Sequence, residues 1–166
     1  ADGARYAAQA KDNGAACVVA EAPTGIDVAE VVVGEARKAL AEAAVALYKD
    51  PSKRLMLIGL TGTNGKTTGA FLCRAILMEA GIDAGMVGTA GYYIGQERRD
   101  ALHTTPEAPD LCDLLDTMSA QGLKAAVLEV SSHALALRRT YGLSFSSVVF
   151  TNLTRDHLDF HGDEQR

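Results

Sequence analysis

Residues 55–79 read LMLIGLTGTNGKTTGAFLCRAILME and contain the element that decides the fold. The apolar run Leu55–Leu60 leads into a glycine-rich loop, and Thr68–Glu79 has the apolar spacing of an amphipathic helix. In such a loop, glycines let backbone N–H groups turn toward a phosphate, and the helix N-terminus adds a favourable dipole. The stretch therefore predicts a strand, a phosphate-binding loop and a helix in succession.

The loop also supplies side chains that suit a nucleotide. Lys66 would neutralise phosphate oxygens, and the hydroxyl of Thr67 can ligate Mg²⁺. The expected nucleotide-binding residues are Gly62, Thr63, Asn64, Gly65, Lys66, Thr67 and Thr68. The strict phosphate-loop pattern has a glycine where this chain has Leu60. The alternative is a glycine-rich turn that binds nothing, but packing gives no reason for a lysine after the last glycine.

Further strands and helices alternate after this stretch. Apolar runs at 84–87, 125–130 and 147–151 predict strands, 107–121 predicts a helix, and 91–99 predicts a hairpin. Strands that are apolar on both faces and alternate with helices indicate a mostly parallel sheet covered on both sides. We therefore predict an α/β fold in which a phosphate-loop type of sheet, mostly parallel, is flanked by helices.

Residues 1–52 are predicted to form a separate part of the chain. Short helical and strand patterns lie at 5–13, 16–19, 31–33 and 35–48. Elements of this size bury little surface, so we expect residues 1–34 to finish a small α/β domain whose beginning lies outside the chain. We expect a boundary near residue 52, with residues 53–166 belonging to a second domain.

Composition argues against several classes of protein. The 166 residues include 16 basic and 21 acidic ones, a net charge of −5, and 48% are hydrophobic, which is typical of a globular protein. No basic run is present, so we expect neither nucleic acid nor a membrane as partner. Cys17, Cys73 and Cys112 are widely separated and predict no disulfide framework. Neither a membrane-spanning run nor a signal peptide is recognisable, so we expect a cytoplasmic location.

Glu129 lies inside the apolar run 125–130. Burial of a carboxylate is costly unless a cation or hydrogen bonds compensate for it, and a metal ion is one such cation. Ligands of open α/β sheets gather at the carboxyl ends of the strands, where Glu129 and the phosphate loop both lie. We expect Glu129 to contact a metal beside the loop; the alternatives are an exposed sheet edge and a structural ion pair.

Two other polar motifs leave their interpretation open. Thr104 and Thr105 precede Pro106 and a predicted helix, so Thr105 is either an N-cap or, with Thr104, a contact for a substrate anion. His157 and His161 are four residues apart, but no Glu follows the first and no Cys lies nearby, so zinc is weakly indicated. Since Mg²⁺ prefers oxygen ligands, spacing alone favours a hydrogen-bonded polar role for His157.

Taken together, these motifs resemble the ATP-dependent Mur ligases, a family of amide-bond-forming enzymes of bacterial cell-wall precursor synthesis. The resemblance rests on residues 61–68, 104–106, 129–135 and 152–162, and is looser over 1–52. The motifs are most similar to the MurE branch, which adds the third amino acid to UDP-N-acetylmuramoyl-L-alanyl-D-glutamate. This similarity implies a fragment that contains the end of the UDP-binding N-terminal domain and the first part of the central ATP-binding domain.

The resemblance implies ATP and Mg²⁺ as cofactors. Lys66 would hold the β- and γ-phosphates, and Thr67 would bind the first Mg²⁺. Glu129 would contact the metals, and His157 would bind a second Mg²⁺. Phosphorylation of the D-glutamyl carboxylate by ATP would precede attack by the incoming amino group.

The same resemblance implies that the UDP-muramoyl dipeptide and an amino acid are the substrates of a monomeric ligase. The matching substrate positions are Thr104, Thr105, Ser131 and Arg139. His103 and Leu137 stand where the family often has Asn and Gln. The family's bridging carbamylated lysine and amino-acid-binding domain lie beyond residue 166, so we expect no amide-bond formation by these residues alone.

Three other functions remain open. A generic P-loop NTPase or kinase requires only the loop and Glu129, whereas the motifs at 103–111 and 150–162 favour a ligase. A related ligase, such as a folylpolyglutamate or cyanophycin synthetase, is a closer alternative. Ser131-Ser132-His133 together with Asp156-His157 favours the muramoyl enzyme. A non-catalytic nucleotide- or partner-binding piece is the third possibility.

Overall fold

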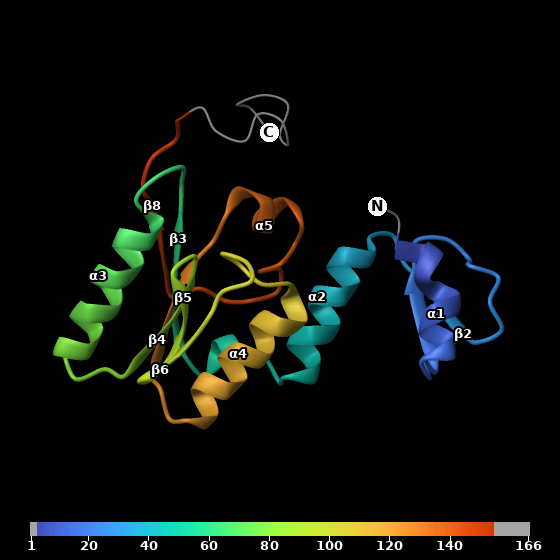
Figure 1. Ribbon diagram of the computed structural model, residues 1–166, viewed down its shortest axis with the longest axis horizontal. Coiled ribbons are helices and arrows are strands. Elements are labelled where there is room, and N and C mark those ends of the chain that lie inside the picture. Colours follow the sequence, from blue (N-terminus) through green and yellow to red (C-terminus); the bar gives the residue numbers. More distant parts are fainter. Residues whose placement is uncertain (1–2, 155–166) are drawn as a thin grey trace. The chain divides into compact units, whose positions relative to one another are not determined.

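The computed structural model describes residues 3–154, which form two compact units divided between Leu40 and Ala41. The elements in chain order are η1 Gly3–Tyr6, α1 Ala7–Asp12, β1 Cys17–Ala20, β2 Ala29–Val32, α2 Ala36–Leu47, η2 Pro51–Lys53, β3 Met56–Thr61, α3 Lys66–Glu79, β4 Ala84–Gly88, β5 Gly91–Ile94, β6 Glu97–Arg99, α4 Ala108–Ala120, β7 Ala125–Glu129, α5 Ser132–Ala136 and β8 Ser147–Phe150 (Figure 1). Helix α2 runs across the division. The domain boundary expected near residue 52 stays a prediction.

The first unit pairs β1 with β2 in a two-stranded parallel sheet. Among its described residues, the buried apolar side chains are Ala7 and Ala20. Val19, Val31 and Val32 are about half exposed. This unit therefore buries little apolar surface within itself, because its strands and helix are short.

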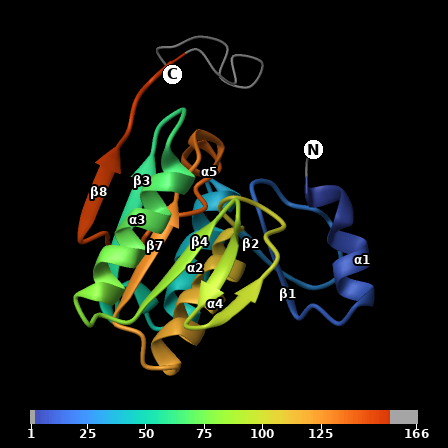
Figure 2. The same ribbon diagram turned by 60° about the vertical axis from the view of Figure 1, so that its left-hand side comes forward.

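The second unit is built on a six-stranded sheet in the order β6-β5-β4-β7-β3-β8. Strands β4, β7, β3 and β8 run parallel, and β5 and β6 extend the sheet antiparallel from β4 (Figure 2). The predicted mostly parallel sheet is confirmed, and the predicted hairpin is the β5–β6 pair. Every strand and helix expected from the apolar pattern of residues 53–151 is present; helix α3 begins at Lys66 rather than Thr68.

Helices cover both faces of this sheet, with α3 on one face and α4 on the other. Successive side chains of each strand point to opposite faces and therefore pack against different helices. In β7, Val127 faces α3 in a cluster with Ala70, and Leu128 lies in the larger core with Leu111 and Met118 of α4 (Figures 1 and 2). Glu129 is two residues beyond Val127 and therefore lies on the α3 side. The alternation thus directs this carboxylate toward the start of α3.

The parallel register brings the predicted motifs to one edge. Leu60 pairs with Glu129 and Thr61 pairs with Phe150, so the loop after β3, the end of β7 and the segment after β8 are neighbours. A short helix, α5, follows β7 and was not predicted. Its N-cap is Ser131, whose hydroxyl accepts a hydrogen bond from the Ala134 N–H at 3.1 Å.

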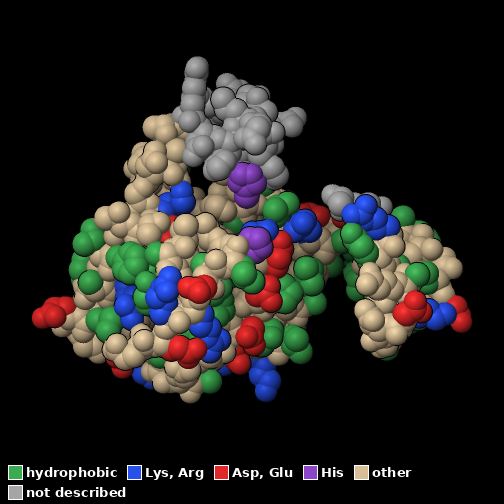
Figure 3. Space-filling model, in the orientation of Figure 1, with side chains coloured by type: hydrophobic (Ala, Val, Ile, Leu, Met, Phe, Trp, Pro, Cys, Tyr) green, Lys and Arg blue, Asp and Glu red, His purple; other side chains and the backbone are tan. Residues whose placement is uncertain are grey.

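None of the helices in residues 3–154 has the length and apolar character needed to span a bilayer. On the face seen in Figure 3, Lys and Arg side chains lie among Asp and Glu side chains rather than in one patch. This distribution agrees with the absence of a basic run in the sequence.

Candidate nucleotide-binding site

The loop between β3 and α3 requires glycine at two positions. Gly62 has φ +129° and Gly65 has φ +86°, conformations that other residues rarely adopt. A side chain at position 62 would also clash, because its Cβ would lie 2.3 Å from the Thr151 hydroxyl and 2.7 Å from the Asn152 carbonyl oxygen. Backbone conformation and close packing therefore both account for Gly62.

The segment after β8 forms hydrogen bonds to the loop between β3 and α3. The Asn152 side chain pairs with the backbone of Asn64: its Oδ1 accepts from the N–H at 3.1 Å, and its Nδ2 donates to the carbonyl at 3.0 Å. The Thr151 hydroxyl donates to the same carbonyl at 2.7 Å. The hydroxyl of Thr63 bonds both the N–H and the carbonyl of Thr154. The loop conformation is therefore fixed without a ligand.

Lys66 folds back over this loop. Its ammonium group donates to the carbonyls of Gly62 at 2.6 Å and Thr63 at 3.0 Å. Two neutral carbonyls leave the positive charge uncompensated, and an ammonium group is a compact point charge that suits phosphate oxygens. The lysine is thus positioned where the sequence pattern predicted a phosphate-binding cation.

Glu129 is fully buried at the end of β7. Its Oε2 accepts from the Thr67 hydroxyl at 2.8 Å, and its Oε1 accepts from the Thr89 N–H at 3.0 Å. Within residues 3–154 it has no ion-pair partner, so the alternative of a structural ion pair is not supported there. Its complete burial also excludes the exposed sheet edge.

Thr89 is a site residue that the sequence interpretation missed. It follows β4, and its hydroxyl lies 2.9 Å from that of Thr104 and 3.4 Å from Oε2 of Glu129. Ligands of open α/β sheets gather at the carboxyl ends of the strands, and this rule singled out Glu129 and the phosphate loop. The same rule applies to Thr89, a polar residue just after an apolar parallel strand. Residue 89 lies between the strand predicted at 84–87 and the hairpin predicted at 91–99, and the sequence analysis assigned no role to it.

The four predicted substrate positions fall into two groups. Thr104 and Ser131 line the pocket. Thr105 is buried: its hydroxyl donates to the Glu129 carbonyl at 2.8 Å and accepts from the Ser131 N–H at 3.2 Å. Arg139 donates to the Thr105 carbonyl at 2.8 Å and to Glu107 at 2.6 Å, and is not among the pocket-lining residues.

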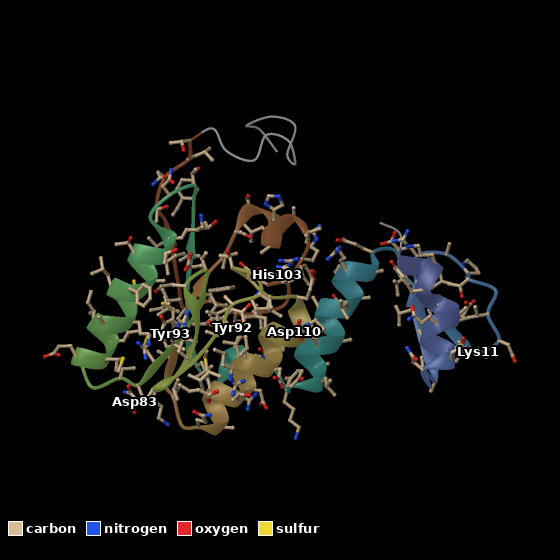
Figure 4. The ribbon with its side chains drawn as sticks, viewed as in Figure 1. Lys11, Asp83, Tyr92, Tyr93, His103 and Asp110 are labelled. Atoms are coloured by element: carbon tan, nitrogen blue, oxygen red, sulfur yellow. The ribbon has the colours of Figure 1, made fainter. Side chains whose placement is uncertain are left out.

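The alternative role of Thr105 as an N-cap is wrong. Helix α4 begins at Ala108, its N-cap is Glu107, and no side chain caps it. Thr105 instead bonds the end of β7, a partner distant in sequence that helix-start rules do not include. His103, two residues before Thr105, has a backbone carbonyl that accepts a hydrogen bond from the Tyr92 hydroxyl at 2.7 Å (Figure 4).

These groups enclose a pocket of about 280 Å³. Its lining residues are Thr63, Asn64, Gly65, Lys66, Thr67, Thr68, Thr89, Thr104, Glu129 and Ser131. No cluster of three or more His, Cys, Asp or Glu side chains exists among residues 3–154 that could hold a metal without further ligands. His157 lies outside the described residues, as does His161.

Comparison with known proteins identifies the family. Residues 60–166 match the model of the Mur ligase middle domain. The chain belongs to the Mur ligase family. The resemblance inferred from the motifs is therefore confirmed.

Individual relatives of this Mur ligase chain are longer. A UDP-N-acetylmuramoyl-L-alanyl-D-glutamate–2,6-diaminopimelate ligase from Solibacter usitatus (strain Ellin6076) is 46% identical over 168 residues, which cover 100% of this chain and 34% of the relative. A solved structure of a ligase with the same name superposes with a TM-score of 0.81 at 34% identity, covering 96% of this chain and 32% of that one. The chain thus spans about a third of the length of these relatives.

A more distant solved structure, E. coli FolC in complex with DHPP and ADP, has a TM-score of 0.58 at 19% identity and covers 81% of this chain and 37% of its own. Identity at this level shows a shared fold alone. The fold alone therefore does not determine the function, which has to be argued from the site.

Proposed function

We propose that this chain provides the ATP-binding part of a ligase that joins an amino acid to UDP-N-acetylmuramoyl-L-alanyl-D-glutamate. One observation carries the proposal: Lys66 and the buried carboxylate of Glu129 line the same pocket, and neither charge is paired with an opposite charge among residues 3–154. A nucleotide phosphate and its cation would compensate for both charges. The names of the longer relatives supply the substrate class.

The phosphate loop would bind ATP through its geometry and through Lys66. Gly62 and Gly65 shape the turn, and α3 starts directly at Lys66, so the helix N-terminus faces the pocket. Backbone N–H groups at a helix start favour an anion, and Lys66 can leave its two carbonyl acceptors for phosphate oxygens of higher charge. Thr63, Asn64, Thr67 and Thr68 complete the proposed nucleotide contacts.

The pocket also fits Mg²⁺, which prefers oxygen ligands. The Thr67 hydroxyl oxygen and Oε2 of Glu129 lie 2.8 Å apart, and the carboxylate is buried with only neutral hydrogen-bond donors around it. These two residues would hold the ion, and the resemblance adds His157. When bound, Mg²⁺ neutralises charge on the β- and γ-phosphates.

The substrate would occupy the side of the pocket formed by Thr104 and Ser131. Thr105 and Arg139 bond the backbone around these two residues, so we propose that they act on the substrate by fixing that wall. In the proposed reaction a substrate carboxylate oxygen attacks the γ-phosphorus and ADP leaves. The amino group then attacks the acyl carbon and inorganic phosphate leaves. The protein's own groups position the reactants and balance charge.

The proposal extends to the setting of the whole protein. We propose a cytoplasmic monomer that uses no nucleic acid or membrane as partner. The net charge of −5 and the interspersed charges in Figure 3 support the absence of a polyanionic partner, whereas the location and the monomeric state follow from the family resemblance. The names of the longer relatives supply 2,6-diaminopimelate as the added amino acid, with L-lysine or another amino acid as the alternatives.

Substrate dependence separates the candidate functions. A protein of the relatives' full length that carries this sequence should release phosphate from Mg²⁺·ATP only when the UDP-muramoyl dipeptide and an amino acid are both present. Phosphate release without the dipeptide would instead support an NTPase or kinase. Release with a folyl glutamate or a cyanophycin primer in its place would support a related ligase.

A further inference from the structure

Thr89 joins two parts of the pocket that do not bond each other directly in the described contacts, the carboxylate of Glu129 and the hydroxyl of Thr104. We propose that Thr89 is a positioning residue that transmits the state of the Glu129 carboxylate to Thr104 by reversing a chain of hydroxyl hydrogen bonds. No heavy atom needs to move for this effect, because only the hydroxyl hydrogens of Thr89 and Thr104 rotate.

The surroundings hold all three groups in place. The Thr89 N–H fixes Oε1 of Glu129 at 3.0 Å, and Gly88 leaves room for that oxygen, since a Cβ there would lie 2.1 Å from it. On the other side, the carbonyl and N–H of His103 both bond the Tyr92 hydroxyl, which anchors the residue before Thr104. The relay therefore connects two rigid walls.

The carboxylate determines the direction of the chain. An ionised carboxylate only accepts hydrogen bonds, whereas a hydroxyl has one hydrogen to donate. In the contact at 3.4 Å only the Thr89 hydroxyl has a hydrogen to donate to Oε2 of Glu129. Either hydroxyl could donate in the contact at 2.9 Å; because a carboxylate is a stronger acceptor than a hydroxyl, the relay assigns the Thr89 hydrogen to Glu129 and the Thr104 hydrogen to Thr89. Thr104 then has only lone pairs for a group in the pocket.

A cation at Oε2 would reverse this chain. Positive charge there repels the Thr89 hydrogen, which then turns to Thr104 and leaves the Thr104 hydrogen free to point into the pocket. Thr104 changes from an acceptor to a donor and becomes suited to an anionic group such as a substrate carboxylate. The change of Thr104 on cation binding rests on the proposed function, whereas the hydrogen-bond chain from Glu129 through Thr89 to Thr104 does not.

The variant Glu129→Gln imitates the reversed state without a ligand. The Thr89 N–H can bond only an oxygen, so the amide oxygen takes the Oε1 position and the amide NH₂ takes the Oε2 position. The NH₂ donates to the Thr89 hydroxyl, whose own hydrogen must then go to Thr104. Removing the Thr104 hydroxyl breaks the Thr89–Thr104 bond in both backgrounds. In Glu129→Gln it also leaves the Thr89 hydrogen without an acceptor, whereas in the unsubstituted chain that hydrogen stays on the carboxylate. The loss of stability should therefore be larger in Glu129→Gln.

The test is a double-mutant cycle in equilibrium urea unfolding of the 166-residue chain. Thr104→Val should lower the folding constant at least about twofold more in the Glu129→Gln background, because only there does the Thr89 hydroxyl lose the acceptor of its hydrogen. This difference should vanish with Thr89→Val and return with Thr89→Ser. The matched control is Thr117→Val in α4, which should show no coupling to Glu129→Gln. Coupling below twofold, or coupling that survives Thr89→Val, overturns the relay.

A second measurement does not depend on the Glu129→Gln variants, which could fail to fold. It also tests the hydrogen-bond relay separately from the proposed nucleotide site. We would follow threonine methyl resonances of the unsubstituted chain and of Thr89→Ser and Thr89→Val during a titration with Mg²⁺·ATP. The Thr104 methyl should shift in the first two, and at least threefold less in Thr89→Val, while Thr67 shifts in all three. If the Thr104 methyl shifts equally in Thr89→Val, the relay is wrong. If the Thr67 methyl does not shift in the unsubstituted chain, the proposed nucleotide site is wrong, and the unfolding cycle alone then decides the relay.

Discussion

Replacing Asn152 with alanine should loosen the phosphate loop at one identifiable amide. The substitution removes two hydrogen bonds, from the Asn64 N–H at 3.1 Å and to the Asn64 carbonyl at 3.0 Å. The carbonyl keeps a donor, the Thr151 hydroxyl at 2.7 Å, whereas the N–H loses its acceptor. The effect should therefore concentrate on the N–H.

Its size follows from the number of bonds lost. Each exposed side-chain-to-backbone bond contributes about 0.5–1.5 kcal/mol, and the Asn64 carbonyl keeps the Thr151 donor, so the loss should be below the full sum and destabilise the closed loop by about 1–2 kcal/mol. This corresponds to an exchange rate of the Asn64 amide about 5- to 30-fold faster.

Native-state hydrogen exchange measured by NMR resolves this effect. The Thr63 N–H is an internal control, because it donates at 2.9 Å to the backbone carbonyl of residue 152, which alanine retains. Asn13→Ala, in the first unit, is the matched control variant. If Thr63 and Asn64 accelerated equally, or Asn64 did not change, the argument that Asn152 holds the loop through its side chain would be wrong.

Three other predictions concern the pocket and the core. In a ligase of full length, Lys66→Ala and Glu129→Ala should each raise the barrier by about 3–4 kcal/mol, so steady-state phosphate release should fall at least a hundredfold; near-normal release by either variant contradicts its role. Gly88→Ala should abolish Mg²⁺·ATP binding measured by calorimetry, because its Cβ would lie 2.1 Å from Oε1 of Glu129, whereas Gly34→Ala, with nothing within 4 Å, should bind normally. Burial, with a smaller contribution from a nearby aspartate, raises the pKa of Cys112 from 9.0 to about 11, so its contribution to stability is complete below pH 9 and falls as the pH rises toward 11, where only the unfolded chain releases the proton. Urea unfolding at pH 8 and pH 10 should show this loss in the unsubstituted chain and not in Cys112→Ala.

The sheet could be predicted from the sequence because its strands are apolar on both faces. Residues 125–128 are all buried in β7, so their apolar run carries no alternation and indicates a parallel strand covered on both sides. Glu129 stood out for the same reason, as the one carboxylate directly after such a run. The two-residue periodicity also determines that it faces α3, although this required knowing which side α3 covers.

The hydrogen bonds of Thr105 and Arg139 around the pocket could not be predicted in the same way. A hydroxyl group bonds many partners, and nothing in the sequence around Thr105 indicates that its partner is the Glu129 carbonyl, 24 residues away. Arg139 has the same difficulty, since its acceptors lie on the loop before α4. Such pairings depend on the relative placement of elements, which the apolar pattern leaves undetermined.

The pocket contains two opposite charges that the fold keeps from neutralising each other. The Lys66 ammonium group bonds backbone carbonyls, and the Glu129 carboxylate bonds hydroxyl and N–H donors, so within residues 3–154 each is solvated by neutral groups. An ion pair between them would satisfy both charges and leave neither for a ligand. Neutral partners cost less to displace or reorient than an opposite charge, because their interaction with the ion is weaker. The separation therefore keeps one cationic and one anionic position open in the same small volume, which is the arrangement that a polyphosphate with its own metal ion requires.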